Sequence, residues 1–459
     1  MNPRAASAIL AARATAWLSR LSGRGASSLP GLVARRIDPL ILTRLGQELD
    51  WGSVLMTGTN GKTTTAAMVR QMLESLGEVT LSNPAGANLI VGLTAAFVQR
   101  RGGRRQDRPR RALLETDEAT MPKASRELKP RVITVTNFFR DQLDRYGELS
   151  TTVRLVTEGI AFLRPDGMLV LNADDPQVAS LGATGRPALY YGVEAEGAMS
   201  PQGYDTVDAR ACPQCNAPLI YETRYYAHLG HYRCPRCSWS RPKPDIAVQR
   251  WDRAQQKVWI RVRGEVRAFA WLAPGLYNLY NEVAAVATAC ALDIPLEVAQ
   301  ASLAKFRPAF GRMEMVMAGR KRLWLALVKN PVGFNQVLAA VAEDADESYA
   351  MMVVINDRYA DGRDVSWLWD VDFEHWMPRL SPQHWYISGL RAHDMAVRLK
   401  YAGLLDGSAR VEESIAISLD RALKDVGTDT LYVLPTYTAM LEVRQLLSQR
   451  GLVRHFREG

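Results

Sequence analysis

The chain has 459 residues, which is too long for one ordinary core and predicts two or three domains. Its hydrophobic fraction of 47% and charged fraction of 23% are those of a soluble globular protein, and no stretch is long enough for a membrane-spanning helix. The net charge of +9 favours polyanionic ligands, which leaves nucleotides, nucleic acid and an anionic membrane face as candidates.

Residues 1–50 are predicted to form an N-terminal helical segment. Apolar residues recur there at helical spacing, at Ile9, Ala12, Ala16, Trp17 and Leu21. Arg13 and Arg20 interrupt the apolar run, which argues against a secretory signal. We expect the apolar face to pack on the protein itself, with contact to a membrane surface as the alternative.

Short apolar strands then alternate with helical stretches, and each strand ends in polar residues. The predicted strands are 53–57, 79–82, 112–114, 132–135 and 168–171, followed later by 323–328, 349–356, 384–389 and 430–436. This pattern predicts an α/β fold with a parallel sheet and a ligand site at the carboxyl ends of its strands. We predict a central domain over 51–310, with an insertion at about 201–244, and a second α/β domain over 311–459.

The segment TGTNGKTTT, residues 57–65, lies between a predicted strand and a predicted helix. Its glycines let backbone N–H groups close around phosphate, and the helix N-terminus adds its positive end. Lys62 can reach the β- and γ-phosphates, and the Thr63 hydroxyl can ligate Mg²⁺. Met56 stands where the full Walker spacing requires glycine, so the loop is a shortened variant. The predicted nucleotide-binding residues are Gly58, Thr59, Asn60, Gly61, Lys62, Thr63 and Thr64.

Polar residues also follow the next strands. Glu115 closes one strand, where its carboxylate can hold the same Mg²⁺ as Thr63. Asp117 and Glu118 come next, and we expect at least one of them only to solvate the strand end. Further candidates are Asn137, Asp141, Asp144 and Arg145 after the following strand, and Asn278 and Asn281 on one face of a later helix. Read alone, Asn278 could equally cap that helix.

Four of the five cysteines form two tight pairs with the spacing C-x₂-C-x₁₈-C-x₂-C, at Cys212, Cys215, Cys234 and Cys237. Four thiolates close a tetrahedral site with no open position, so we predict a structural zinc ribbon in a reducing compartment. His228 and His231 are expected to be spacers, and the lone Cys290 to be core. A zinc ribbon often binds nucleic acid, but this one interrupts a nucleotide-binding domain, so we expect no nucleic-acid partner.

In order and content these motifs resemble the central domain of the Mur ligases. The matching segments are Thr57–Thr63, Glu115, Thr136–Arg145 and Asn278–Asn281, with Gln142 where many amino-acid-adding members have histidine. The resemblance implies a Mur ligase-like fold and ATP-dependent chemistry, in which a carboxylate becomes an acyl phosphate and an amine attacks it. It also implies catalytic roles for Lys62 and Glu115, places Asn137 and the two later asparagines at the nucleotide, and requires Mg²⁺.

Three further segments restrict the resemblance to one family among the Mur ligase-like proteins. They are YADGRDVSWLWDVDFE at residues 359–374, LVKNPVGFNQ at 327–336 and GRME at 311–314. These segments resemble the MurT family, the synthetase subunits of lipid II isoglutaminyl synthases. The resemblance implies that lipid II is amidated during peptidoglycan biosynthesis, with ammonia from a GatD-type glutamine amidotransferase. It adds Arg312 to the nucleotide site and makes Asp364 the acid that orients a histidine in the partner subunit.

The resemblance further implies a cytoplasmic location and leaves open a peripheral position at the inner face of the membrane. One alternative function is a stand-alone ligase of the Mur or folylpolyglutamate type, which would add a free amino acid without a partner. Another is a zinc-ribbon scaffold that uses ATP only as a switch. Among the remaining acids, Asp361 is expected in a turn, and Asp370, Asp372 and Glu374 on a solvated surface.

Overall fold

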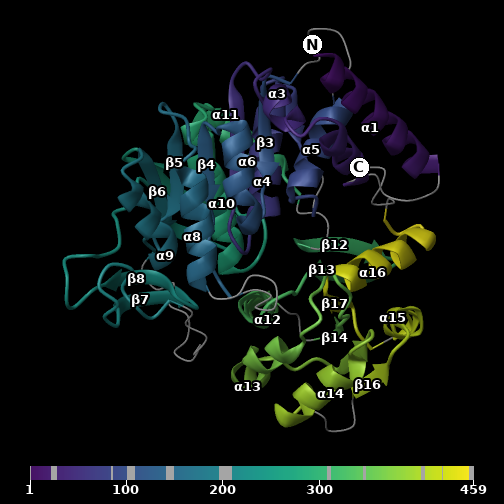
Figure 1. Ribbon diagram of the computed structural model, residues 1–459. Helices are drawn as coiled ribbons and strands as arrows, with labels where there is room; N and C mark the ends of the chain where they lie inside the picture. The colour runs from purple at the N-terminus through teal and green to yellow at the C-terminus, as the bar shows by residue number, and fades with distance from the viewer. Residues whose placement is uncertain are drawn as a thin grey trace.

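The computed structural model describes residues 2–21, 28–83, 86–100, 109–140, 149–195, 209–307, 312–344, 348–404, 409–425 and 427–453. Two large sheets, one of nine strands and one of six, belong to two bodies that lie next to each other (Figure 1). Residues of both bodies line one cavity. None of the helices in the described part of the chain combines the length and hydropathy that crossing a bilayer requires.

The nine-stranded sheet has the order β11-β10-β9-β6-β5-β4-β1-β3-β2. Its strands are β1 (Gly52–Thr57), β2 (Thr80–Ser82), β3 (Arg111–Glu115), β4 (Val132–Val135), β5 (Met168–Asn172), β6 (Ala188–Val193), β9 (Ile246–Asp252), β10 (Lys257–Val262) and β11 (Glu265–Ala270). The strands from β2 to β9 are parallel, and β10 and β11 add an antiparallel edge. β1 is buried throughout because helices cover both faces of the sheet.

Alternate residues of β1 enter different cores. Val54 and Met56 pack with one cluster of helices, and Leu55 packs with the other. The helices of the first cluster are α4 (Lys62–Ser75), α10 (Leu276–Ala291) and α11 (Leu296–Lys305). Those of the second are α1 (Pro3–Leu21), α2 (Leu29–Ile37), α3 (Ile41–Gly46), α5 (Ile90–Arg100), α6 (Met121–Leu128), α8 (Leu149–Ile160) and α9 (Pro176–Ser180). The N-terminal segment therefore shares a core with the central sheet.

The cysteine-rich insertion occupies an unusual place in this sheet. β6 and β9 are parallel neighbours, and such a pair is ordinarily connected by a crossover helix. Here the chain forms instead the antiparallel hairpin of β7 (Ile220–Tyr226) and β8 (Leu229–Arg233). Tyr225 and Leu229 of the hairpin belong to the same hydrophobic core as β6 and α10, and Tyr225 and Tyr232 donate to Val193 O and Ala173 O, so the insertion packs against the carboxyl ends of β5 and β6.

The six-stranded sheet has the order β12-β13-β17-β14-β15-β16, parallel except at β12. Its strands are β12 (Arg312–Ala318), β13 (Lys321–Ala326), β14 (Tyr349–Val354), β15 (His384–Ser388), β16 (Ala409–Glu412) and β17 (Thr430–Pro435). Its helices are α12 (Pro331–Asp344), α13 (Phe373–Trp376), α14 (Ala392–Tyr401), α15 (Ile415–Lys424) and α16 (Tyr437–Gln449). Short 3₁₀ turns, η2 (Glu118–Thr120), η3 (Leu181–Thr184), η4 (Ser366–Asp370) and η5 (Met377–Arg379), complete the described elements.

The predicted fold class is confirmed, and every predicted strand is present within a few residues. The domain limits stay a prediction, which the change of sheet between β11 and β12 supports. Of the expected apolar face of the first helix, Ile9, Ala12 and Ala16 are buried, Trp17 was wrongly included because it is 63% exposed, and the side chain of Leu21 lies outside the described residues. Trp17 follows the buried Ala16 by one residue, about 100° around the helix, which turns its indole toward solvent.

Candidate active site

The phosphate loop connects β1 to α4, as its sequence predicts. Gly58 and Gly61 have φ values of +122° and +87°, a region that side chains rarely adopt. A Cβ on Gly58 would lie 2.3 Å from Thr136 Oγ1, and a Cβ on Gly61 would lie 2.1 Å from Asn281 Oδ1. Both glycines are therefore required by backbone conformation and by space.

The backbone of Asn60, in the middle of the loop, is hydrogen-bonded to the two residues that follow β4. Asn137 Oδ1 accepts a hydrogen bond from Asn60 N over 2.9 Å, and Asn137 Nδ2 donates to Asn60 O over 3.1 Å. Thr136 Oγ1 donates to the same carbonyl over 2.7 Å. Asn137 thus acts in this structure as a support for the loop, one layer away from the cavity surface.

Lys62 lies at the first position of α4 and is 8% exposed. Its Nζ donates to Gly58 O and lies 3.4 Å from both carboxylate oxygens of Glu118. Burial raises the pKa of Glu118, while the nearby ammonium of Lys62 opposes that rise. The expectation that Asp117 or Glu118 only solvates a strand end is wrong, because both are buried and Asp117 caps η2.

The proposed Mg²⁺ ligands lie side by side. Thr63 Oγ1 donates a hydrogen bond to Glu115 Oε2 over 2.5 Å. Two neighbouring ligands of an octahedral Mg²⁺ ion, at about 2.1 Å from the metal, are roughly 3 Å apart. If the distance between these two oxygens lengthened slightly, to roughly 3 Å, both could therefore ligate the same ion. A hydroxyl and a carboxylate are also oxygen donors of the kind that Mg²⁺ prefers.

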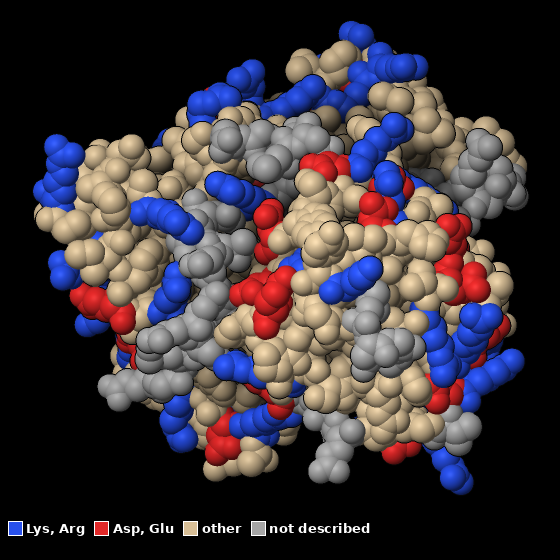
Figure 2. Space-filling model, turned by 90° about the horizontal axis from the view of Figure 1, so that it is seen from below, with Lys and Arg blue, Asp and Glu red and all other residues tan. Residues whose placement is uncertain are grey.

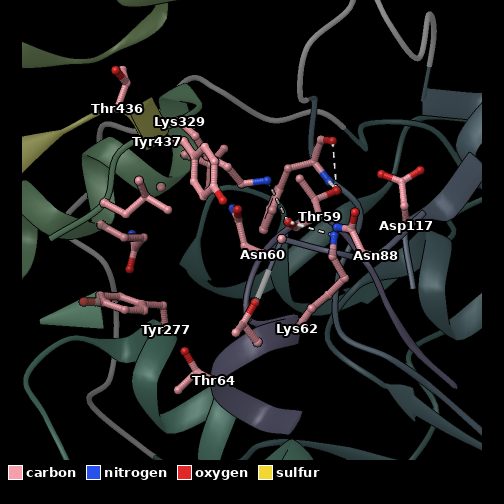
Figure 3. A pocket seen from close by; sticks show the side chains of 18 of the residues that line it. Thr59, Asn60, Lys62, Thr64, Asn88, Asp117, Tyr277, Lys329, Thr436 and Tyr437 are labelled. Atoms are coloured by element: carbon pink, nitrogen blue, oxygen red, sulfur yellow. Dashed lines mark hydrogen bonds between the residues drawn. The ribbon is translucent and has the colours of Figure 1, made fainter. Parts of the chain in front are cut away.

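The loop opens into a cavity of about 410 Å³ between the two sheets. In Figure 3, Lys329 and Tyr437 from the C-terminal body approach Thr59 and Asn60. Lys329 Nζ donates to Thr59 O over 3.1 Å, and the amides of Asn60 and Asn330 exchange hydrogen bonds of 3.2 and 3.4 Å. The C-terminal body thus adds a cation to the cavity and is hydrogen-bonded to the loop.

Of the other residues predicted to bind the nucleotide, some line the cavity and some do not. Asn281 lines the cavity, whereas Asn278 does not and instead donates to Pro274 O over 2.6 Å. The N-cap of α10 is Gly275, so Asn278 is not the cap either. The side chain of Arg312, and Asp141, Asp144 and Arg145, lie outside the described residues.

Two acids of the stretch at 359–374 have separate roles. Asp361 is buried in a turn, as expected, and lines the cavity. It accepts hydrogen bonds from Thr438 N and Oγ1, 2.7 and 2.5 Å away, while burial raises its pKa. Asp364 is exposed on the outer surface, where the backbone N–H of Ser366 donates to it over 2.8 Å and lowers its pKa. Asp364 is therefore ionised and accessible.

The remaining acids of this stretch differ in role. Asp372 caps α13 through the backbone N–H of His375. Glu374 forms a bidentate ion pair with the buried Arg398, at 2.6 and 2.7 Å. Asp370 is exposed, which fits the expected solvated surface. Asp372 and Glu374 thus stabilise the fold, and Asp370 is an exposed acid in addition to Asp364.

The four ribbon cysteines converge as the spacing predicts. Their Sγ atoms lie within 4.8 Å of one another, with Cys212–Cys237 at 3.7 Å and Cys215–Cys234 at 3.4 Å. These separations are too long for disulfides and match the roughly 3.8 Å between thiolates around Zn²⁺ with bonds of about 2.3 Å. Two backbone N–H groups also donate to Cys234 Sγ, which suits a metal-bound thiolate. No histidine joins this group among the residues that the structure describes.

The fifth cysteine, Cys290, is buried in α10, as expected, and burial raises the pKa of its thiol to about 11. Sequence reasoning missed several residues of the cavity, namely Glu118, Lys329, Gln336, Tyr359 and Tyr437, and also Asn330, which contacts Asn60 of the loop. The segment LVKNPVGFNQ carried a signal for three of them, but nothing in it assigned a role to its lysine or asparagine.

Two family models match the chain. Residues 56–208 match the Mur ligase middle domain, and residues 327–440 match the MurT ligase C-terminal domain. Among solved structures, a pseudomurein peptide ligase type C from Methanothermus fervidus superposes with a TM-score of 0.67 at 20% identity, covering 89% of this chain and 80% of that one. Folylpolyglutamate synthase from Mycobacterium tuberculosis gives 0.60 at 14%, covering 89% and 95%. These likenesses show the fold.

Relatives that match along nearly the whole chain identify the family more specifically. The chain is 33% identical, over 99% of both lengths, to the subunit MurT of the glutamine-hydrolysing lipid II isoglutaminyl synthase of Streptococcus pneumoniae. It is 31% identical, over 94% of its own length and 95% of the relative, to the protein of the same name from Staphylococcus aureus. The phosphate loop, the cysteine cluster and the C-terminal match all fit this likeness, and the chain belongs to the MurT family.

Proposed function

We propose that the chain is the synthetase subunit of a glutamine-dependent lipid II isoglutaminyl synthase. It amidates the α-carboxyl of D-glutamate in the stem peptide of lipid II during peptidoglycan biosynthesis. The observation that carries the proposal is the pairing of a cavity lined by residues 59–64 of the glycine loop with Asp364, an exposed acid on the C-terminal body. The named activity of the full-length relatives supports the same conclusion.

The first step uses ATP in the cavity. A carboxylate oxygen of the substrate attacks the γ-phosphorus, ADP leaves, and an acyl phosphate forms. Lys62 on the phosphate loop and Lys329 from the opposite body supply positive charge where the transferring phosphoryl group develops negative charge. Thr63 and Glu115 would hold Mg²⁺, which neutralises phosphate charge when bound.

The second step consumes ammonia. Its nitrogen attacks the acyl carbon, inorganic phosphate leaves, and the nitrogen loses a proton to give the amide. The described part of the chain offers no exposed reactive cysteine outside the ribbon, because Cys290 is buried. A GatD-type glutaminase subunit would therefore release the ammonia, and Asp364 would orient the histidine of that partner.

The surface around Asp364 supports a docking partner. Trp369 and Tyr401 are 53% and 74% exposed and pack edge to face with ring centroids 5.5 Å apart. Val397 and Trp369 also line a shallow hollow beside Ser366. This end of the molecule is at the bottom of Figure 1, and the view from below in Figure 2 shows acidic and basic side chains interspersed with uncharged surface. Exposed aromatic residues of this kind anchor protein interfaces.

Zn²⁺ in the four-cysteine site would be structural, and the cytoplasm is the proposed location. The proposal is tested by purifying the chain with a glutaminase subunit encoded beside it and measuring amidation of lipid II with ATP and glutamine. Amide formation that requires both subunits, or free ammonia in place of the partner, is the expected result. Amidation that proceeds from glutamine with this chain alone would contradict it.

The stand-alone amino-acid ligase is the second candidate, because folylpolyglutamate synthase shares the fold. The same purified chain, assayed for ADP release with free amino acids and no partner, separates the two functions. The proposed function predicts no amino-acid-dependent ADP release.

A further inference from the structure

The first helix presents its large apolar side chains to solvent. α1 packs on its neighbours through small residues, Ala5, Ala8, Ala12 and Ala16, together with Ile9. On its outer side Leu10, Trp17 and Leu18 are 68%, 63% and 58% exposed. Leu10 and Trp17 are seven residues apart, so they project from the same side of the helix about 10 Å apart. Scattered exposed apolar residues are ordinary, but three along one short helix form a patch.

The second helix lies beside the first and carries exposed leucines of its own. Arg4 Nε donates to Ile37 O over 2.6 Å, so the start of α1 lies beside the end of α2, and the two helices form an antiparallel pair. On α2, Leu29 and Leu32 are 49% and 38% exposed. We name the exposed residues Arg4, Leu10, Trp17, Leu18, Leu29, Leu32 and Arg36 the α1–α2 face.

The charge of this region has a single sign. The sequence contains no aspartate or glutamate before Asp38, but it contains arginines at positions 4, 13, 20, 24, 35 and 36. Asp38 itself is buried and pairs with Arg44 at 3.3 Å, and the Arg35 guanidinium is neutralised by Glu127 at 2.7 Å. Arg4 and Arg36 remain exposed beside the apolar side chains.

We propose that the α1–α2 face binds the surface of a membrane that contains anionic phospholipids. A tryptophan and leucines would enter the headgroup region, and the arginines would contact lipid phosphates. The proposal rests on the proposed function, because lipid II is a membrane-anchored substrate that a surface-bound enzyme meets more often. In Figure 1, α1 lies at the opposite end of the molecule from α13 and α14, so a partner at Asp364 would not compete.

A second copy of the chain is a less suitable occupant. A two-fold interface brings the same patch of both copies together, so the exposed arginines of one copy would approach those of the other without an acid between them. An anionic lipid surface supplies the missing negative charge.

Vesicle flotation of the full chain tests the proposal. The protein is mixed with vesicles of phosphatidylcholine alone, or with about one-third phosphatidylglycerol, without ATP or partner. We expect binding only to the anionic vesicles, a decrease of about fivefold in affinity for each of Arg4→Gln and Arg36→Gln, and loss of binding in Leu10→Glu/Trp17→Glu. The control is Val266→Glu on β11, a residue 55% exposed on another surface, which should bind like wild type.

Equal binding of the Leu10→Glu/Trp17→Glu variant, or no wild-type binding to anionic vesicles, would overturn the proposal. So would a wild-type dimer in light scattering that this variant converts to monomer without any vesicle binding. The same variant with its partner should amidate a water-soluble stem peptide at the wild-type rate and vesicle-embedded lipid II more slowly. If wild type amidates neither substrate, the proposed function fails, while the flotation result still decides membrane binding.

Discussion

Thr63 Oγ1 donates a 2.5 Å hydrogen bond to Glu115 Oε2, although 52 residues separate them in the chain. The register of the central sheet explains this contact. Met56 of β1 pairs with Glu115 of β3, so the carboxylate lies beside the strand that leads into the phosphate loop. One hydroxyl and one carboxylate at the start of α4 thus form a preformed oxygen pair.

We predict that Thr63→Ala and Glu115→Ala each abolish ATP-dependent amidation, because each removes an oxygen ligand of the proposed Mg²⁺. Binding of the glutaminase subunit should be unchanged, since that surface is remote. The measurements are amide formation and co-purification. Glu74→Ala is the control, because Glu74 lies on the same helix as Thr63, is exposed, and pairs with the exposed Arg70. Normal amidation in either site variant would remove that residue from the metal site.

Gly61→Ala should weaken ATP binding by more than about tenfold and destabilise the fold by about 1–2 kcal/mol. The new Cβ would collide with Asn281 Oδ1 and hold an alanine at φ +87°. Gly77→Ala is a matched control, because Gly77 has φ +73° with nothing within 4 Å of its Cβ. The control should lose stability and keep ATP affinity, as measured by thermal melting and calorimetric titration. Equal ATP affinity in both variants would contradict the role of the close approach.

Cys212→Ser/Cys237→Ser should release the ribbon metal and destabilise the insertion, because binding energy at such sites is folding energy. Metal content by atomic emission and the melting temperature are the readouts. Cys290→Ala serves as the control, since that cysteine is in α10 and should leave the metal in place. Stoichiometric zinc in the double variant would disprove the assignment.

Asp364→Asn should preserve folding, ATP binding and complex formation, and reduce glutamine hydrolysis by the complex by about 10²–10⁴. An amide cannot stabilise the imidazolium that forms in the partner. High concentrations of ammonia should restore amidation at least in part, since the synthetase cavity is untouched. Asp370→Asn, in an exposed residue of the same stretch, should be silent. Wild-type glutaminase activity in Asp364→Asn would refute the role, and failure of ammonia to rescue would assign Asp364 to the synthetase cavity.

Glu282→Gln should stabilise the protein at pH 8 and matter little near pH 4. Glu282 is fully buried in α10, and burial raises the pKa of its carboxyl well above the ordinary value. The folded state therefore holds a proton that the unfolded state releases, so stability falls as pH rises above the unfolded pKa. The variant removes this loss, on the order of 1 kcal/mol for a buried unpaired group. Denaturant unfolding of both proteins at pH 4 and pH 8 is the measurement. The same difference in free energy of unfolding at both pH values would contradict this account.

Contiguous motifs were predictable from sequence because their chemistry is local. The glycines of the phosphate loop lie within a few residues of one another, and each C-x₂-C pair is likewise a local motif. Lys329 and Asn330 were not predictable as loop partners, because their contacts with Thr59 and Asn60 span 270 residues. Glu118 was misjudged because its partner, Lys62, lies 56 residues away in the chain, a contact that the local sequence does not reveal.

The hairpin of the insertion lies in the connection between β6 and β9, and its Tyr226 belongs to the hydrophobic core and also lines the cavity. The insertion looks dispensable in a linear map of the protein. Removing it would instead uncover the carboxyl ends of β5 and β6 and take Tyr226 from the cavity wall. Shortened versions that end before Cys212 and resume after Cys237 should therefore be insoluble, and loss of the proposed zinc should weaken ATP binding at the proposed site.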